Sequence, residues 1–204
     1  GLVYNHDDNW QWFGGVYKGF NMPGPGSARD DGSPVEKETS IAKEIGVRYT
    51  SPNFFVSWTG FHTDFKDLIV IDNSNADSAP DNAGNVVSKG FELSSTYTPA
   101  EDLQPFTGNI SFYANYTFTN ANLDGAANST DSESAFAGGR DGSNVPYVPD
   151  HRISFGADYE YSNFDFGINM TYHSETHGTA DESETEEFQG AADARNGKID
   201  SAFL

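Results

Sequence analysis

The chain has 204 residues, of which 31 are acidic and 11 are Lys or Arg, giving a formal net charge of −20. This balance excludes nucleic acid as a partner, because phosphate contacts need clustered basic side chains, and the lack of cysteine excludes disulfide frameworks and thiolate metal sites. No apolar run approaches the roughly 20 residues of a membrane-spanning helix, which leaves soluble β-proteins and β-barrels open.

Alternation of apolar and polar side chains predicts nine strands, the first and last incomplete. The expected strands are Gly1–Asn5, Trp10–Phe20, Ser40–Tyr49, Phe54–Ile71, Val86–Thr98, Gly108–Leu123, Tyr147–Tyr161, Phe164–Glu175 and Gly197–Leu204. The connections alternate between short turns and long polar loops rich in Gly, Pro, Asn and Asp. The stretch Lys89–Pro99 is the clearest strand, because Phe91, Leu93 and Tyr97 point to one side and Glu92 to the other.

Short turns on one rim and long loops on the other are typical of transmembrane β-barrels, whose strands of about 9–11 residues cross the bilayer at a tilt. Aromatic residues near the strand ends favour the same fold, since barrels carry aromatic girdles at both interfaces. These residues are Trp10, Trp12, Tyr97, Tyr147, Tyr159 and Tyr161. A soluble β-sandwich or β-helix is the alternative, and it would bury its apolar faces between sheets. Because nine strands with incomplete ends cannot close, we expect an all-β, antiparallel segment of a larger barrel.

Five stretches, in order along the chain, resemble TonB-dependent outer-membrane receptors of the ferric-citrate and siderophore type. They are WQWFGGVYKGFNMPGPGS (Trp10–Ser27), EKETSIAKEIGVRY (Glu36–Tyr49), FHTDFKDLIVI (Phe61–Ile71), GNVVSKGFELSSTYTP (Gly84–Pro99) and NVPYVPDHRISFGADYEY (Asn144–Tyr161). In the second stretch Glu44, Gly46, Arg48 and Tyr49 match the family pattern, whereas Ala42 and Lys43 depart from it.

The resemblance implies that residues 1–204 are part of a receptor barrel of about 22 strands with a plugged lumen, short periplasmic turns and long extracellular loops. The plug domain, the segment that contacts TonB and the C-terminal strands have no counterpart here, so we expect them elsewhere in a longer protein. The implied function is active uptake of an iron chelate, a ferric siderophore or ferric citrate, across the outer membrane of a Gram-negative bacterium. The implied partners are the ferric chelate, TonB through the plug, and outer-membrane lipid and lipopolysaccharide. A passive porin-like or structural barrel and a secreted soluble β-protein are the alternative functions.

No nucleophile elbow, metalloprotease motif or phosphate loop is present, so we expect no enzymatic activity, no cofactor and no resident metal. Arg29 and Arg140 lie in loops beside Pro and Gly and are candidate ligand-binding residues, because guanidinium groups match anionic chelates. His173 and His177, spaced by four residues on a strand and loop, are further candidates.

Charged residues within the strands are expected to face the lumen and to pair with neighbouring strands or with the plug. They are Lys18, Arg48, Glu92, Arg152, Asp158 and Glu160. The acidic run Asp181–Glu187 predicts either a mobile loop or a site for divalent cations that bridge lipopolysaccharide. The acidic balance disfavours a citrate-like trianion and leaves neutral or cationic chelates open.

Overall fold

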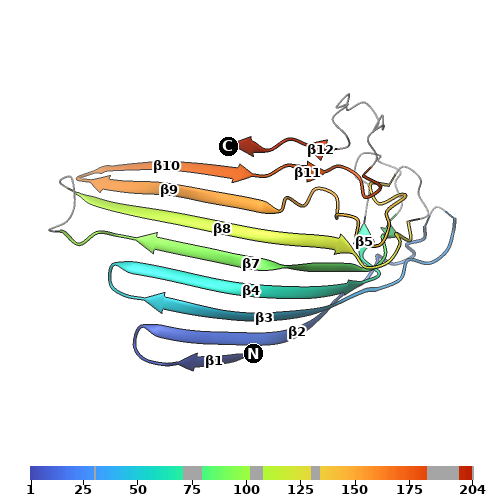
Figure 1. Ribbon diagram of the computed structural model, residues 1–204, viewed down its shortest axis with the longest axis horizontal. Coiled ribbons are helices and arrows are strands. Elements are labelled where there is room, and N and C mark those ends of the chain that lie inside the picture. Colours follow the sequence, from blue (N-terminus) through green and yellow to red (C-terminus); the bar gives the residue numbers. More distant parts are fainter. Residues whose placement is uncertain (30, 71–79, 102–107, 130–133, 183–197, 204) are drawn as a thin grey trace.

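The computed structural model describes residues 1–29, 31–70, 80–101, 108–129, 134–182 and 198–203. Its strands are β1 (Leu2–Asn5), β2 (Trp10–Asn21), β3 (Glu38–Thr50), β4 (Phe54–Lys66), β5 (Ile69–Val70), β6 (Asp81–Asn82), β7 (Val86–Tyr97), β8 (Asn109–Leu123), β9 (His151–Tyr161), β10 (Phe164–His173), β11 (Thr176–His177), β12 (Lys198–Ile199) and β13 (Ala202–Phe203). Nine of them form one antiparallel sheet in the order β1-β2-β3-β4-β7-β8-β9-β10-β13 (Figure 1). This confirms the predicted all-β, antiparallel segment.

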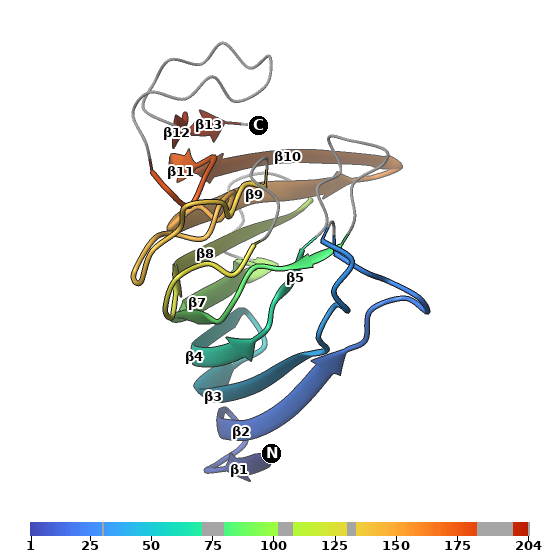
Figure 2. The ribbon, with the colours of Figure 1, turned by 90° about the vertical axis from the view of Figure 1, so that its right-hand side faces the viewer.

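Every long strand of this sheet pairs with its neighbours in sequence, so the sheet is a simple meander. The turn between β9 and β10 has only two residues and places Tyr161 opposite Phe164. The turns lie at one end of the strands and the long connections, after β2, β4, β8 and β10, at the other (Figure 1). We call these the turn end and the loop end; Figure 2 looks onto the loop end.

Strand register divides the sheet into two chemically different faces. The face that carries Trp12, Val47, Trp58, Leu93 and Tyr116 is called the outer face, and these five residues lie in one row across five strands. The opposite face, called the inner face, has one polar row made of Ser57, Ser94, Asn115 and Ser154, with Arg48 at its end. The two faces follow from the period of two in a strand.

The apolar side chains of the outer face are exposed within the described residues. Ile45 is 61% exposed and Ile168 is 66% exposed, and no second sheet covers either. A soluble sandwich would have buried this face against a second sheet, because extended exposed apolar patches are rare on soluble monomers. The arrangement therefore favours a surface that lipid covers.

A chain of aromatic rings crosses the outer face at the turn end. Trp10 contacts Tyr49 with ring centroids 4.9 Å apart, Tyr49 contacts Phe54 at 6.3 Å, and Phe54 contacts Tyr97 at 6.5 Å. Further along the sheet, Tyr159, Tyr161, Phe164 and Phe166 stack on one another near the β9–β10 turn. The predicted girdle is thus present at this end, as in barrels where such rings occupy the membrane interface.

The buried hydrophobic cluster lies at the loop end, where the long connections pack onto the inner face. Val86 and Leu123, from β7 and β8, contact Ala83, Phe136 and Ala180 from three loops. We call this cluster the loop core. It fixes the loops over one face of the sheet and leaves the outer face bare.

Two strand predictions were wrong at the loop end. The strand expected over Phe54–Ile71 ends at Lys66, because Asp67 adopts a positive φ of 55° and turns the chain into the small β5–β6 sheet. The strand expected from Tyr147 begins at His151, since Tyr147 also has a positive φ, of 62°. Pro146 and Pro149 on either side of it cannot donate to a ladder.

The other differences are smaller. The expected last strand, Gly197–Leu204, is two short strands, β12 and β13, and its residues 197 and 204 lie outside the described part. Residues 183–187 of the acidic run also lie outside it. Within the described residues, no helix is long and apolar enough to cross a membrane.

Candidate functional site

The inner face carries most of the charged residues predicted to face the lumen. Arg48, Glu92, Arg152, Asp158 and Glu160 all belong to this face by register. The prediction was wrong for Lys18, which lies opposite Ile41 and shares the outer face with Trp12 and Val16. The physical reason is parity, because a residue six positions from Trp12 must point to the same side of the strand.

Among the described residues, none of the five inner-face charges forms an ion pair with another. The guanidinium of Arg48 instead donates to Gln11 Oε1 at 2.8 Å and lies 5.0 Å from the centroid of the Phe13 ring. A cation held by an amide and an aromatic face keeps its positive charge uncompensated. Arg48 therefore contributes positive potential to the inner face.

Arg29 is anchored in the loops. Its Nε lies 3.2 Å from Asp81 Oδ1 and its Nη2 donates to Asn82 Oδ1 at 2.7 Å. Asn82 is fully buried and also donates to the carbonyls of Glu36, at 3.0 Å, and Asp67, at 2.8 Å. This network joins the loop after β2 to the loop after β4, so Arg29 positions loops in this state.

Arg140 is exposed at the surface of the loop after β8. The backbone N–H of Arg140 donates to Ser143 Oγ at 3.0 Å, and the carboxylate of Asp141 accepts a hydrogen bond from the Gly125 N–H at 2.9 Å. These two bonds fix the turn on which Arg140 lies. No described side chain bonds to its guanidinium. Of the two predicted arginines, Arg140 is the one whose charge faces solvent.

His173 and His177 are not brought together in one site. His173 ends β10 and lies opposite Arg152 on the inner face, whereas His177 belongs to the β11–β12 sheet and pairs with Lys198. The described residues hold no cluster of three or more His, Cys, Asp or Glu that suits a metal ion. The two histidines thus belong to different sheets.

The neighbouring positions of Arg152 and His173 were missed by the sequence reasoning. Both lie at the loop end of the inner face, on adjacent strands. The two-residue turn at Ser162 and Asn163 would have revealed them, because in such a hairpin the residue numbers of every opposed pair have the same sum. Together they place a guanidinium and an imidazole side by side on the wall below the loops.

A small pocket of about 290 Å³ lies at the loop end beside His151, Glu175, His177 and Lys198. Lys198 Nζ contacts Glu175 Oε1 at 2.6 Å, and this hydrogen bond lowers the pKa of Glu175 and raises the pKa of Lys198. His151 Nδ1 lies 2.9 Å from the Tyr116 hydroxyl. Asp150 also lines the pocket, and among the described residues no ion pair involves its carboxylate, so the pocket is not built for an anionic ligand.

Comparison with known proteins shows one family across the chain. A family model described as "TonB dependent receptor-like, beta-barrel" matches residues 1–202. An "Iron-regulated outer membrane virulence protein" of Vibrio cholerae serotype O1 is 31% identical over 138 residues, which cover 58% of this chain and 21% of that protein. The chain thus spans about a fifth of the length of this curated relative.

Two solved structures have the same fold at low sequence identity. The unliganded ferric citrate transporter FecA is 23% identical with a TM-score of 0.69, covering 99% of this chain and 28% of that one. The ferric yersiniabactin uptake receptor FyuA of Yersinia pestis is 17% identical with a TM-score of 0.66, covering 98% and 27%. The nine-stranded sheet therefore corresponds to a segment of a larger barrel in each.

Proposed function

The chain belongs to the TonB-dependent receptor-like β-barrel family, and from that premise we propose that it forms part of the wall and mouth of an outer-membrane receptor that takes up an iron chelate. The receptor would lie in the outer membrane of a Gram-negative bacterium, with the loop end outside the cell. Residues 1–204 would belong to the barrel domain alone. This segment contributes binding surface and carries out no chemical reaction.

The division of the sheet into two faces carries this proposal. An exposed apolar outer face suits lipid, whereas the polar inner face suits a lumen filled by water and a plug. The loops packed by the loop core onto the inner face provide a preformed mouth on the side where a ligand would enter. A secreted soluble β-protein is disfavoured, because nothing in the described part covers the outer face.

We assign the residues of the mouth as follows. Arg140 contacts the chelate first, because its guanidinium faces solvent on a fixed turn. His173 with Arg152 forms a second contact on the wall below. Arg29 positions the loops through Asp81 and Asn82 and contacts ligand only if that network opens. His177 lies in the small pocket and supports the loop after β10.

The mechanism is capture followed by energised release. The loops and the apex of a plug hold the chelate, and TonB, driven by the proton gradient of the inner membrane, shifts the plug. Plug and TonB contact belong to the remainder of the protein. The net charge of −20 favours chelates that are neutral or cationic over citrate-like trianions.

The decisive experiment measures uptake of ⁵⁵Fe by cells that express the full-length protein, with ferric catecholate, hydroxamate and carboxylate chelates as probes. We expect one chelate class to enter with a micromolar or lower KM, and its uptake to stop when TonB is deleted or the proton gradient is dissipated. Uptake that persists without TonB, or equal permeation of unrelated small sugars, would identify a passive pore instead.

A second measurement is the mass of the intact polypeptide extracted from outer membranes. We expect a mass several times the 22.2 kDa of this chain, consistent with the lengths of the related receptors. A mature protein near 22.2 kDa would leave no room for a plug and would reject the receptor proposal.

The residue assignments are tested with Arg140→Gln in the same receptor. Losing one charged hydrogen-bonding partner costs about 1.5–3 kcal/mol, so we expect the affinity for the chelate that the receptor takes up to fall by about tenfold or more. The matched control is Arg29→Gln, which should loosen the loops and raise their hydrogen exchange. An unchanged affinity in Arg140→Gln would remove this residue from the site.

A further inference from the structure

Four of the six lysines of this acidic chain lie on the outer face of four adjacent strands. Lys18, Lys43, Lys66 and Lys89 occupy β2, β3, β4 and β7, each in the half nearer the loop end. Among the outer-face positions of these strands there is one carboxylate, Asp64. A chain with a net charge of −20 thus presents a local excess of positive charge on its lipid-facing side.

Register aligns part of this set into a row across the strands. Lys43 lies opposite His62, and His62 lies opposite Lys89, so the three side chains follow one another over β3, β4 and β7. Asp64 lies 3.3 Å from Lys43 Nζ and 3.6 Å from His62 Nδ1, which holds these two groups in place. We call Lys18, Lys43, His62, Lys66 and Lys89 the basic band.

The height of the basic band is that of a membrane interface. On β7, Tyr97 follows Lys89 by eight positions and belongs to the aromatic girdle at the turn end. At about 3.3 Å per residue and a tilt of about 40°, this spacing corresponds to about 20 Å along the membrane normal, close to the apolar band of about 25 Å of a barrel. The lysines therefore lie where the acyl chains of the outer leaflet end and its headgroups begin.

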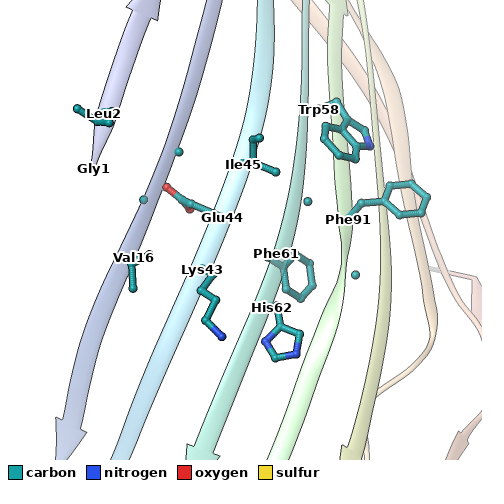
Figure 3. A pocket seen from close by; sticks show the side chains of 14 residues that line it. Gly1, Leu2, Val16, Lys43, Glu44, Ile45, Trp58, Phe61, His62 and Phe91 are labelled. Carbon is teal, nitrogen blue, oxygen red and sulfur yellow. The ribbon is translucent and has the colours of Figure 1, made fainter.

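An apolar groove of about 960 Å³ adjoins the basic band on β2, β3, β4 and β7 (Figure 3). Gly14 and Gly60 leave the outer face low there, and Val16, Ile45, Trp58 and Phe91 line the groove. Lys43 and His62 line the same groove. Its dimensions and its chemistry suit one or two acyl chains whose headgroup is anionic.

We propose that the basic band and this groove bind a phosphorylated glycolipid of the outer leaflet, with the phosphates on Lys43, His62 and Lys89 and an acyl chain against Ile45, Trp58 and Phe91. Lysine suits this role, because its long stem packs on apolar surface while its ammonium group reaches the headgroup level. The inference rests on the proposed outer-membrane location and on the loop end being outside the cell.

The test uses the full-length receptor in detergent micelles and bisphosphorylated lipid A as the probe, with binding measured by native mass spectrometry. We expect the triple variant Lys18→Gln, Lys43→Gln and Lys89→Gln to bind at least about tenfold more weakly than the native protein. The corresponding triple Lys→Arg variant keeps the charge and should bind within about twofold of it. The single variants Lys37→Gln and Lys198→Gln, whose lysines lie outside the outer face, should bind as the native protein does.

Three further arms separate the possible occupants. Dephosphorylated lipid A should bind native protein as weakly as the triple Gln variant binds the intact lipid. Equal binding by the triple Gln variant would overturn the proposal. Competition by inorganic phosphate as effective as by lipid A would point to a free-anion site, and dimers that only native protein forms would point to a second copy; both would overturn it. Folding of each variant is checked on gels: a folded barrel migrates compactly until the sample is heated, and the temperature at which this compact migration is lost should match that of the native protein.

Binding of the ferric chelate is measured on the same samples. If lipid binding depends on the basic band while no chelate binds, the glycolipid site stands and iron uptake fails. If the chelate binds while the lysine variants leave lipid binding unchanged, iron uptake stands and the glycolipid site is rejected.

Discussion

The outer and inner faces of this sheet are made by the same strands, yet the outer face is apolar and uncovered whereas the inner face is polar and covered by loops at one end. Leu93 and Ser94 are neighbours in β7, and Leu93 lies between Trp58 and Tyr116 whereas Ser94 lies between Ser57 and Asn115. The outer face lacks any cover in the described part, while the loop core closes over the loop end of the inner face. With the proposed outer-membrane location, lipid would cover the outer face, whereas the loops of the chain itself cover the inner face.

The largest expected effect comes from placing a charge at the middle of the outer face. Leu93 is four residues from both Lys89 and Tyr97, and so lies near the centre of the apolar band. We expect Leu93→Arg to destabilise the folded receptor in bilayers by about 2–4 kcal/mol, measured by denaturant unfolding. Ser94→Arg on the inner face is the matched control and should change stability by less than about 1 kcal/mol. Similar losses in both variants would show that the outer face does not contact lipid.

Two glycines on the neighbouring strands β4 and β7, one on each face, test how tightly each face is packed. A Cβ at Gly90, on the inner face, would collide with the backbone oxygen of Phe118 and meet the Phe61 ring at 3.0 Å. A Cβ at Gly60, on the outer face, would meet only the far end of the Trp58 ring, at 3.0 Å. We therefore expect Gly90→Ala to cost about 1–3 kcal/mol, because the facing strand must move. Gly60→Ala should cost little, and equal melting temperatures for the two variants would contradict this difference.

The loop cover of the inner face depends on Asn82. Replacing this fully buried amide with Ala removes the Asn82 Oδ1 acceptor from Arg29 Nη2 and from the Glu36 N–H. We expect Asn82→Ala to lower the free energy of loop opening by about 1–3 kcal/mol, measured by hydrogen exchange of the loops after β2 and β4. The wall strands should keep their protection. Asn128→Ala, at an exposed position of a neighbouring loop, is the control and should leave the loops unchanged.

The smallest effect concerns the ion pair of Glu175 and Lys198 beside the small pocket. The pKa of Glu175 is lowered and that of Lys198 is raised by their hydrogen bond. The contribution of the pair is therefore complete between the ordinary values of 4.5 and 10.5. It is lost as the pH falls through the lowered pKa of Glu175, or rises through the raised pKa of Lys198. In the native protein, the hydrogen-exchange protection of β11 and β12 should be highest within this pH window and should fall at its acidic end. In Glu175→Gln this loss of protection at acidic pH should disappear. If the loss remains in the variant, another titrating group causes it.

The sequence by itself determined the strands and their faces. Period-two alternation needs only local chemistry, so nine strands, the girdle residues Trp10 and Tyr97, and the separation of short turns from long loops were all predictable. Counting along β2 would also have placed Lys18 on the outer face, since parity is a property of the chain alone.

Only the tertiary structure decided which groups meet. The engagement of Arg29 by Asp81 and Asn82, the separation of His173 from His177, and the end of β4 at Lys66 depend on loops that close over distances no local pattern encodes. The alignment of Lys43, His62 and Lys89 depends on the register of three strands, which turn lengths and pairing fix together. Side-chain alternation is a property of one strand, whereas a binding surface is a property of several strands in register.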